Sequence, residues 1–364
     1  MQVQNYISKQ KKLFQIALSL LQELIAIPSF SKDEGTTADA IELLLQQNGV
    51  VTKRKLNNVW CCNKYFDRSK PTILLNSHHD TVKPNKGYTN DPFEAKIEEG
   101  KLYGLGSNDA GGALVSLLAT FLHFHERADL NYNFIFAATA EEEISGNNGI
   151  ACLLNDLSPI DFAIVGEPTL MQMAIAEKGL MVLDCKSNGK AGHAAREEGE
   201  NAIYKALTDI EWFRNFDFEK VSPMLGKIKM SVTIIKAGEQ HNVVPAVCEF
   251  TVDVRTTDAY TNEEVLEIIK SHVTCEIVPR SFRLQPSSIS EEHPFVLEGK
   301  KLNRTTYGSP TTSDQALMPW PSLKMGPGDS ARSHSANEFI YIHEIEEAIE
   351  IYIHLLEQLN ENSN

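Results

Sequence analysis

Short apolar runs alternate with longer amphipathic stretches along the first half of the chain. Strand-like runs cover 72–76, 133–140 and 161–169, and a helical pattern, AGGALVSLLATFLHF, begins at Ala110 between the first two. Runs that are apolar throughout are typical of strands buried on both faces, and their alternation with helices predicts parallel strands with crossover helices. We therefore expect an α/β domain with a mainly parallel sheet and helices on both faces.

The pattern changes near Ala174. The stretches AIAEKGLMVLDCKSN, GKIKMSVTIIKAG and AVCEFTVDVR are longer and more alternating, and a helix-like segment follows the first and the third. This texture predicts a smaller α+β domain with an antiparallel sheet. Helix and loop patterns resume after PSSISEEHP. We therefore predict that 174–284 is inserted between two parts of one larger domain, 1–173 and 285–364.

Composition narrows the class of protein. A chain of 364 residues is too long for one ordinary domain, and its formal net charge of −15 argues against nucleic acid or an anionic membrane surface as a partner. The apolar stretch 13–27 is too polar and too short for a membrane span and lacks a cleavage signal, so we expect an amphipathic helix. Six cysteines without a CxxC pair predict free thiols and a cytoplasmic location.

Five polar clusters lie where predicted strands end or in glycine-rich loops. Open α/β sheets bind their ligands at the carboxyl ends of the strands, so polar side chains at these places are candidates for a site. The candidates are His78, His79 and Asp80; Asp109; Glu141, Glu142 and Glu143; Glu167; and His334.

Each cluster also has a structural explanation. His79 should point away from His78, because adjacent residues of an extended chain face opposite sides. Asp109 is a good N-cap for the helix that the pattern starts at Ala110. Three consecutive glutamates are usually a solvated charge run, but these directly follow a strand predicted to be buried, which favours a functional site.

The candidates together comprise imidazoles and carboxylates, and no cysteine is among them. This mixture is typical of Zn²⁺, Co²⁺ or Mn²⁺, and a bridging carboxylate holds two such ions about 3.5 to 4 Å apart. One glutamate beyond the ligand set would then be free to act as a base.

The order and wording of these motifs resemble the dinuclear-zinc family that contains acetylornithine deacetylase, succinyl-diaminopimelate desuccinylase, aminoacylase and carboxypeptidase-type exopeptidases. The resemblance covers essentially the whole chain, including the inserted domain. It implies that His78 and Glu167 bind one zinc ion, that Glu143 and His334 bind the other, and that Asp109 bridges the two ions.

The same resemblance assigns the residues around the metals. It implies that Asp80 hydrogen-bonds His78 and fixes its tautomer, an arrangement common around metal-bound histidine. Glu142 would be the general base, because the family pattern places the base immediately before the metal-binding glutamate. Glu141 stands where many relatives have Asp, a difference that we expect to be harmless.

The inserted domain also contributes candidates. His193 in GKAGHAAR matches a family histidine that reaches the active site, often from the partner subunit of a dimer, to polarise the scissile carbonyl. Asn242 in HNVVP and Arg255 in DVR match positions that hold substrate polar groups, Arg255 through a carboxylate. Lys178 in AEKG is a further candidate for a substrate carboxylate. Each of three candidates also has a structural explanation. His193 could be a turn residue, Arg255 a surface residue of a strand, and Lys178 a surface residue at a domain hinge.

The resemblance implies a cytoplasmic, homodimeric hydrolase that uses two zinc ions, or cobalt, to cleave the amide bond of an N-acyl amino acid. N-acetyl-L-ornithine or N-succinyl-L-ornithine, giving ornithine for arginine biosynthesis, is the favoured substrate, because the length, VGEPT and AEKG look most like that branch. Acetylcitrulline, acetyl-lysine and succinyl-diaminopimelate remain alternatives, as does a dipeptidase with the same metals. A non-catalytic binding protein would lack a ligand or the base, and none is missing.

Overall fold

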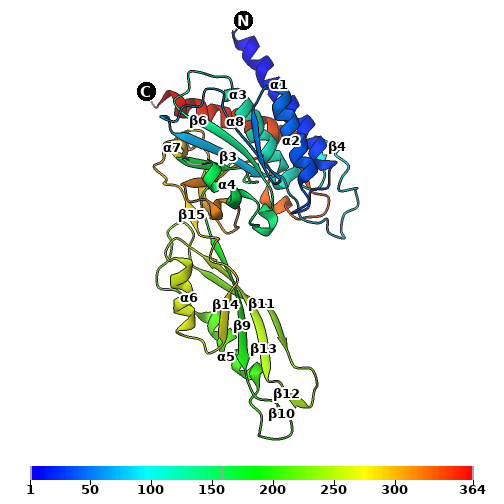
Figure 1. Ribbon diagram of the computed structural model, residues 1–364, viewed down its shortest axis with the longest axis vertical. Coiled ribbons are helices and arrows are strands. Elements are labelled where there is room, and N and C mark those ends of the chain that lie inside the picture. Colours follow the sequence, from blue (N-terminus) through cyan, green and yellow to red (C-terminus); the bar gives the residue numbers. More distant parts are fainter. Residues whose placement is uncertain (1, 158, 363–364) are drawn as a thin grey trace. The chain divides into compact units, whose positions relative to one another are not determined.

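The computed structural model describes residues 2–157 and 159–362, which form two compact units (Figure 1). The first unit comprises Met1–Ile175, Ser288–Tyr307 and Ser313–Asn364, and the second comprises Ala176–Ser287 and Gly308–Thr312. The second unit thus takes in a five-residue segment outside the 174–284 range expected for the insertion. That segment is too short to carry a periodic pattern of its own, so sequence gave no reason to separate it from its neighbours.

A nine-stranded sheet lies at the centre of the first unit. Strands β3, β6, β7 and β17 run parallel, and the flanking pairs β1–β2, β2–β6 and β17–β8 are antiparallel. The predicted mainly parallel sheet is confirmed. Its order is β1 (Thr52–Lys55), β2 (Asn58–Cys62), β6 (Asn133–Thr139), β3 (Thr72–His78), β7 (Phe162–Val165), β17 (Ser322–Lys324), β8 (Met173–Glu177) and β15 (Ser287–Ser288), with β16 (Thr306–Ser309) also paired to β8.

Helices cover both faces of this sheet, as the alternating pattern predicted (Figure 1). On one face, Leu153 of α4 (Ile150–Leu157) packs in a cluster with Leu74 and Ile135. On the other, Phe124 of α3 (Gly112–Phe124) stacks on Phe134, with ring centroids 4.7 Å apart. Neighbouring residues of one strand thus serve opposite faces. The remaining helices of this unit are α1 (Gln2–Ile25), α2 (Gly35–Gln47), α7 (Pro294–Lys301) and α8 (Ile342–Glu361).

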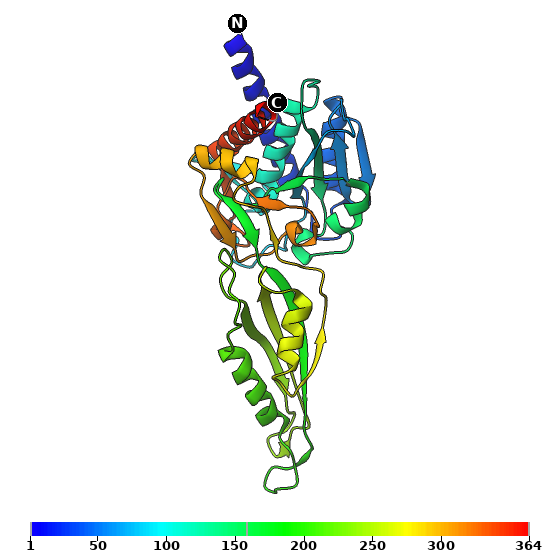
Figure 2. The ribbon, with the colours of Figure 1, turned by 90° about the vertical axis from the view of Figure 1, so that its left-hand side faces the viewer.

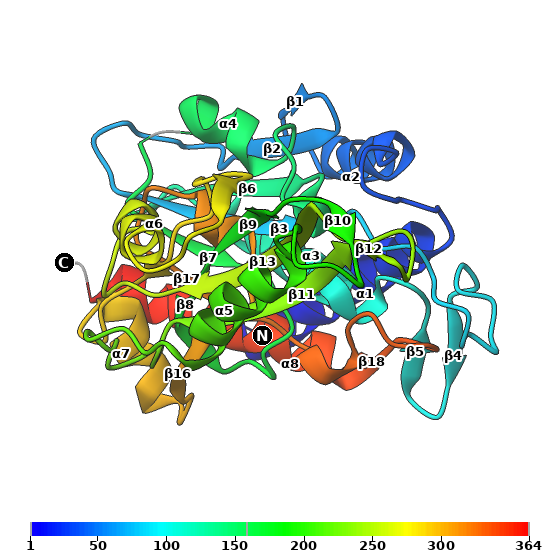
Figure 3. The same ribbon diagram turned by 90° about the horizontal axis from the view of Figure 1, so that it is seen from below.

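A small three-stranded sheet joins two distant parts of the chain (Figure 3). Strand β5 (Lys101–Tyr103) pairs with both β4 (Lys96–Glu98) and β18 (Phe339–Tyr341), antiparallel in each case. Next to this pairing, the backbone N–H of Gly104 donates a hydrogen bond to the carbonyl oxygen of Glu338 at 3.0 Å. The loop after β5 is thereby held next to residue 338, which matters for the site described below.

The second unit is an antiparallel sheet with its helices on one face (Figure 2). Alternate residues such as Met181 and Val254 pack against the helices, which confirms the predicted α+β domain. The sheet order is β11 (Lys229–Ala237), β13 (Val247–Thr256), β9 (Gly179–Asn188) and β14 (Glu276–Pro279); the helices are α5 (Ala202–Asn215) and α6 (Asn262–Lys270); and β10 (Gly192–His193) pairs separately with β12 (Val243–Val244).

The structure corrects the expected start of one helix. Helix α3 begins at Gly112 rather than Ala110, after a short helical turn, Ser107–Gly111. Asp109 has φ −117° and ψ 97°, and the N-cap position belongs to Gly111, so the capping role considered for Asp109 does not apply. Within the described ranges, none of the helices combines the length and apolar character of a membrane span.

Candidate active site

The candidate site lies at the carboxyl ends of three parallel strands. His78 is the last residue of β3 and is paired in register with Thr139, the last residue of β6. Glu142 begins the short helical turn Glu142–Ile144 that follows β6, and Glu167 comes two residues after β7. Because the carboxyl ends of parallel strands meet at one edge, the fold itself brings these side chains together.

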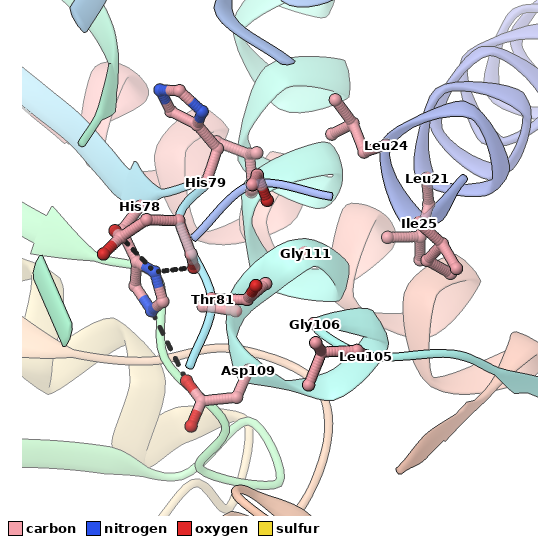
Figure 4. A pocket seen from close by; sticks show the side chains of 14 residues that line it. Leu21, Leu24, Ile25, His78, His79, Thr81, Leu105, Gly106, Asp109 and Gly111 are labelled. Atoms are coloured by element: carbon pink, nitrogen blue, oxygen red, sulfur yellow. Dashed lines mark hydrogen bonds and ion pairs between the residues drawn. The ribbon is translucent and has the colours of Figure 1, made fainter. Parts of the chain in front are cut away.

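The first group of side chains surrounds Nε2 of His78. This nitrogen lies 3.4 Å from Oδ1 of Asp109 and 3.8 Å from Oε1 of Glu167. Figure 4 shows the ring of His78 directed at Asp109, while the ring of His79 points away. One ligand atom from each of His78, Asp109 and Glu167 lies within 4.8 Å of the others.

The second group shares Asp109 with the first. Nε2 of His334 lies 3.0 Å from Oε2 of Glu143 and 3.6 Å from Oδ2 of Asp109. The two oxygens of Asp109 therefore face different histidines. Ligand atoms of Asp109, Glu143 and His334 also lie within 4.8 Å of one another. The structure thus brings all five predicted metal ligands into two groups that meet at one carboxylate.

The chemistry of these groups fits two divalent cations. Nε2 of His78 is buried and has no hydrogen-bond partner, so this nitrogen is available to bind a cation. Burial, together with the nearby charge of Asp109, raises the pKa of Glu167 to about 8. Buried carboxylates clustered around an imidazole are costly without a positive charge between them. Imidazole and carboxylate are also the donors that Zn²⁺ and related ions prefer.

Asp80 links the first group to the predicted base. Nδ1 of His78 lies 3.0 Å from the backbone oxygen of Asp80 and 3.4 Å from its carboxylate Oδ1. Both atoms only accept hydrogen bonds, so Nδ1 carries a proton, and Nε2 is the ring nitrogen that faces the carboxylates of the first group. The Asp80 carboxylate also accepts the backbone N–H of Glu142 at 3.0 Å, that of Glu143 at 3.2 Å and the hydroxyl of Ser31 at 2.6 Å.

Glu142 stands beside both groups and belongs to neither. Its Oε2 lies 3.8 Å from Nε2 of His78, and its side chain is 12 % exposed. Burial raises the pKa of Glu142 well above its ordinary range, and the carboxylates of Glu167 and Asp314 raise it further. A carboxylate at this place can accept a proton from a molecule bound among the ligands.

His79 and Glu141 are neighbours in sequence of His78 and Glu142, but their side chains are held away from the two ligand groups. His79 is buried, with Nδ1 2.8 Å from the Thr37 hydroxyl and Nε2 2.9 Å from the Asn57 carbonyl. Burial lowers its pKa to about 4, so it stays neutral. Glu141 has a left-handed backbone, and its carboxylate accepts the side-chain amide of Asn148 at 2.9 Å. Glu141 therefore organises its own loop, 141–148.

Glu338 was not among the residues predicted from the sequence. Its buried carboxylate accepts three backbone N–H groups, from Gly106 at 3.1 Å, Asn108 at 2.8 Å and Asp109 at 2.9 Å. Burial and the charge of Asp109 raise its pKa to about 8. It clamps the loop that presents Asp109. A single glutamate before a short strand is an ordinary surface pattern, so no local signal marks it.

Asp314 was also not predicted, because no local sequence pattern marks it. It lies in the helical turn Asp314–Leu317 and is buried, and its Oδ2 accepts the hydroxyl of Thr139 at 2.6 Å. Thr139 in turn accepts the side-chain amide of Asn76 at 3.0 Å. Burial raises the pKa of Asp314 to about 7. The chain of hydrogen bonds braces the end of β6, immediately before the three glutamates.

The predicted residues of the second unit fall into two pairs. At one end of its sheet, the exposed His193 accepts the N–H of Ala195 on Nδ1 at 3.1 Å, and the carbonyl of Asn242 accepts the N–H of Ala194 at 3.0 Å. Lys178 and Arg255 lie at the other end, just before β9 and near the end of β13.

Lys178 and Arg255 already have partners within this unit. The guanidinium of Arg255 donates to both carboxylate oxygens of Asp253, at 2.8 and 3.1 Å, and to the hydroxyl of Thr312 at 3.1 Å. The ammonium of Lys178 donates to the carbonyl of Lys227 at 2.6 Å. The fork of Arg255 that we expected for a substrate carboxylate is thus engaged by Asp253.

The sequence of the chain matches the model of one protein family, described as peptidase family M20/M25/M40, over residues 74–358. The chain belongs to this family. The matched region contains both side-chain groups and Glu142. The protein is accordingly a metal-dependent amidohydrolase, and the expected enzyme class and family are confirmed.

Curated relatives of similar length carry deacylase names. The chain is 28 % identical to acetylornithine deacetylase of Proteus mirabilis over 379 residues, covering 93 % of this chain and 96 % of that protein. It is 27 % identical to succinyl-diaminopimelate desuccinylase of Rickettsia akari, covering 92 % and 98 %. A second desuccinylase, from Ruegeria sp., is 24 % identical, with 93 % and 94 % covered.

Solved structures share the fold at low identity. An aminopeptidase PepT from Bacillus cereus superimposes with a TM-score of 0.77 at 17 % identity, covering 95 % of this chain and 98 % of that one. A dinuclear metal-binding M20 peptidase from Bacillus subtilis gives 0.73 at 17 %, covering 96 % and 99 %. An M20 metallo-carboxypeptidase from Sulfolobus solfataricus gives 0.74 at 18 %, covering 94 % and 98 %.

Proposed function

We propose that this amidohydrolase removes the acyl group from N-acetyl-L-ornithine or N-succinyl-L-ornithine, yielding L-ornithine for arginine biosynthesis in the cytoplasm. The observation that carries the proposal is the position of Glu142, a raised-pKa carboxylate beside two groups of metal-ligating side chains that share Asp109. The similarity to acetylornithine deacetylase over 93 % of the chain supports the choice of substrate. The six free cysteines agree with a reducing compartment.

Two zinc ions, or two cobalt ions, are the proposed cofactors. His78 and Glu167 would hold one ion, Glu143 and His334 the other, and Asp109 both. Such a pair polarises an amide carbonyl and makes a nucleophile available near neutral pH.

The protein's own residues would then move the protons. Glu142 accepts the proton of the attacking water and returns it to the departing amine, which its raised pKa favours. Asp80 keeps His78 in one tautomer and holds the backbone of Glu142 in place. His193 donates to the oxyanion that develops on the carbonyl oxygen, and Asn242 binds a polar group of the substrate. Arg255 and Lys178 are proposed to act on substrate carboxylates.

A homodimer is the proposed assembly. Strand β11 is the terminal strand of its sheet, and Ile234 and Ile235 on it are 49 % and 52 % exposed. On α5, Tyr204 and Leu207 are 70 % and 50 % exposed. An exposed edge strand with apolar side chains is a ready template for pairing with a second copy.

A second candidate is the hydrolysis of N-succinyl-diaminopimelate. Two desuccinylases that are 24 % and 27 % identical to this chain favour it. The same metals and the same base would serve this reaction, and compared with N-succinyl-L-ornithine only the group on the amine side differs.

Amine release from a matched panel tests the proposal. The zinc- or cobalt-loaded protein would be offered N-acetylornithine, N-succinylornithine, N-acetylcitrulline, N-acetyl-lysine, N-succinyl-diaminopimelate and several free dipeptides. We expect the highest kcat/KM for an acylated ornithine. Preferred cleavage of dipeptides would retain the metal chemistry and overturn the substrate.

A further inference from the structure

Glu34 is a buried carboxylate that the proposed mechanism does not use. It is the residue before helix α2, and its side chain is fully buried. Although it stands at the N-cap position, its carboxylate makes no capping hydrogen bond to the helix. Burying a carboxylate is costly unless its oxygens accept hydrogen bonds, so the partners of Glu34 show what it does.

The carboxylate of Glu34 accepts hydrogen bonds from three separate parts of the chain. Its Oε1 accepts the backbone N–H of Lys32 at 2.5 Å and that of Glu141 at 3.2 Å. Its Oε2 accepts the side-chain amide of Asn57 at 2.8 Å. One oxygen atom therefore ties the start of α2 to the loop that follows β6.

Both backbone positions held by this oxygen have the left-handed conformation. The φ angle is 82° at Lys32 and 54° at Glu141. Neither residue is glycine, and a side chain makes this conformation costly, so it persists only where surrounding contacts hold it. The carboxylate of Glu34 supplies one such contact to each residue.

Glu141 immediately precedes the proposed base, so its backbone sets the direction in which Glu142 leaves β6. The next two N–H groups, those of Glu142 and Glu143, donate to the carboxylate of Asp80. The first N–H groups of a helical turn have no partner within the turn, and here two buried carboxylates satisfy them. Glu34 and Asp80 together hold the backbone of three successive residues.

Glu34 and Asp80 differ in what else they contact. The carboxylate of Asp80 also lies 3.4 Å from Nδ1 of His78, so a change at Asp80 alters a ligand and the base together. None of the three donors to Glu34 belongs to a residue of either ligand group. A change at Glu34 can therefore reach the base through the backbone alone.

We propose that Glu34 is a positioning residue for the base: by holding the left-handed backbone of Glu141, it fixes the direction in which the Glu142 carboxylate faces the two ligand groups. The inference rests on the proposed function, in which Glu142 is the base. The geometry requires the length of the Glu34 side chain and not its charge, because an amide oxygen of equal reach also accepts the N–H of Glu141.

Two substitutions separate reach from charge. Glu34→Gln keeps the length of the side chain and one acceptor oxygen, and the amide of Asn57 can turn its own oxygen toward the new NH2 group. Glu34→Asp keeps the charge but withdraws the carboxylate by one carbon–carbon bond. On the best amide substrate, Glu34→Asp should lower kcat about 10- to 100-fold, the cost of a small misplacement of a reacting group. Glu34→Gln should keep most of the wild-type kcat.

Three further measurements distinguish positioning from a general loss of structure. KM and metal content should stay at their wild-type values in both variants, because no ligand changes. Hydrogen–deuterium exchange of the backbone amides at 141–146 should be faster in Glu34→Asp than in the wild type. Ile41→Ala leaves a cavity beneath the same helix and is the matched control; it should alter neither kcat nor this exchange.

The outcomes separate this inference from the function on which it rests. A wild-type kcat in folded Glu34→Asp, or an equal loss in Glu34→Gln, would overturn the inference. If Glu34→Asp does not fold, Asn57→Ala takes its place, because it removes the donor to Oε2. Its kcat should fall with metal content intact, and an unchanged kcat there would also contradict the inference. Undiminished turnover in Glu142→Gln, measured in the same assay, would instead remove the base from the proposed function.

Discussion

The backbone N–H of Glu142 donates to the carboxylate of Asp80 at 3.0 Å, and the same carboxylate stands 3.4 Å from Nδ1 of His78. One side chain therefore orients a proposed metal ligand and positions the proposed base. The distance between ligand and base is therefore set by two contacts of one carboxylate, in addition to the path of the loop that follows β6. Loss of either link should disturb metal binding and proton transfer together.

Substitutions can distinguish the role of Glu142 from that of the metal ligands. In Glu142→Gln, turnover should fall about 100- to 10,000-fold, because the amide cannot carry the proton. Metal content should stay near two ions per chain, because Glu142 belongs to neither ligand group. Amine release and metal analysis of the same preparation measure both. Glu143→Gln is the matched control and should lose metal; the reverse pattern would exchange the roles of the two glutamates.

Glu338 should support metal binding without touching the metal. Glu338→Gln replaces one acceptor oxygen by a donor opposite the backbone N–H groups of the Asp109 loop. We expect metal affinity to fall about 10- to 100-fold, in the range seen for residues that orient ligands. Titration of the metal-free protein with zinc measures it. The exposed Glu346 provides the control, and equal affinities in Glu338→Gln and Glu346→Gln would refute the clamp.

The buried His79 should make the stability of the folded protein depend on pH. Its pKa is lowered from 6.5 to about 4 in the folded protein, so the unfolded chain binds more protons between these values. Its contribution to the free energy of unfolding is therefore complete above pH 6.5 and is lost as the pH falls toward 4, by up to about 3 kcal/mol.

Denaturant unfolding of the metal-free protein at several pH values measures this effect. The wild type should exceed His79→Gln in stability at pH 7, and the difference should narrow as the pH approaches 4. A difference that stays constant over this range would show that His79 does not titrate as its burial implies.

His193 is expected to act on the reaction and not on the metals. His193→Ala should lower kcat about 100- to 1,000-fold, the usual cost of losing one oxyanion donor, with metal content intact. His241, an exposed histidine beside Asn242, supplies the control. Unaltered kinetics in His193→Ala, or an equal loss in His241→Ala, would remove His193 from the mechanism.

The proposed dimer can be tested at the edge of β11. Ile235→Lys places a charge on an exposed edge strand and should shift the protein from dimer to monomer. Sedimentation velocity measures the change. Val278→Lys alters an even more exposed position on β14, the opposite edge of the sheet, and should leave the dimer intact.

Local pattern predicted the strands and the polar residues at their ends. The runs at 72–76 and 133–140 became β3 and β6, because a strand buried on both faces is apolar throughout. His78 ends β3, and Glu142 lies in the turn that follows β6. The grouping of Asp109 with His334 came from a family resemblance, since nothing local links residues so far apart in the chain.

What the sequence did not reveal depends on tertiary contact. Glu338 and Asp314 gain their roles only when β18 pairs with β5 and when the turn after Ser313 meets Thr139. The engagement of Arg255 by Asp253 is different, because residues two apart on a strand share a face and DVR contained that information. The start of α3 was misplaced because Asp109 and Ala110 have non-helical backbone angles and Gly111 is the N-cap.

The clamp between Glu338 and the Asp109 loop joins residues 229 positions apart. During synthesis the bridging carboxylate is made long before the residue that holds it in place, and His334 also emerges late. A nascent chain that ends before residue 338 therefore lacks the carboxylate that holds the Asp109 loop. The two groups of ligand side chains and the braced loop between them are consequently complete only when nearly the whole chain has been made.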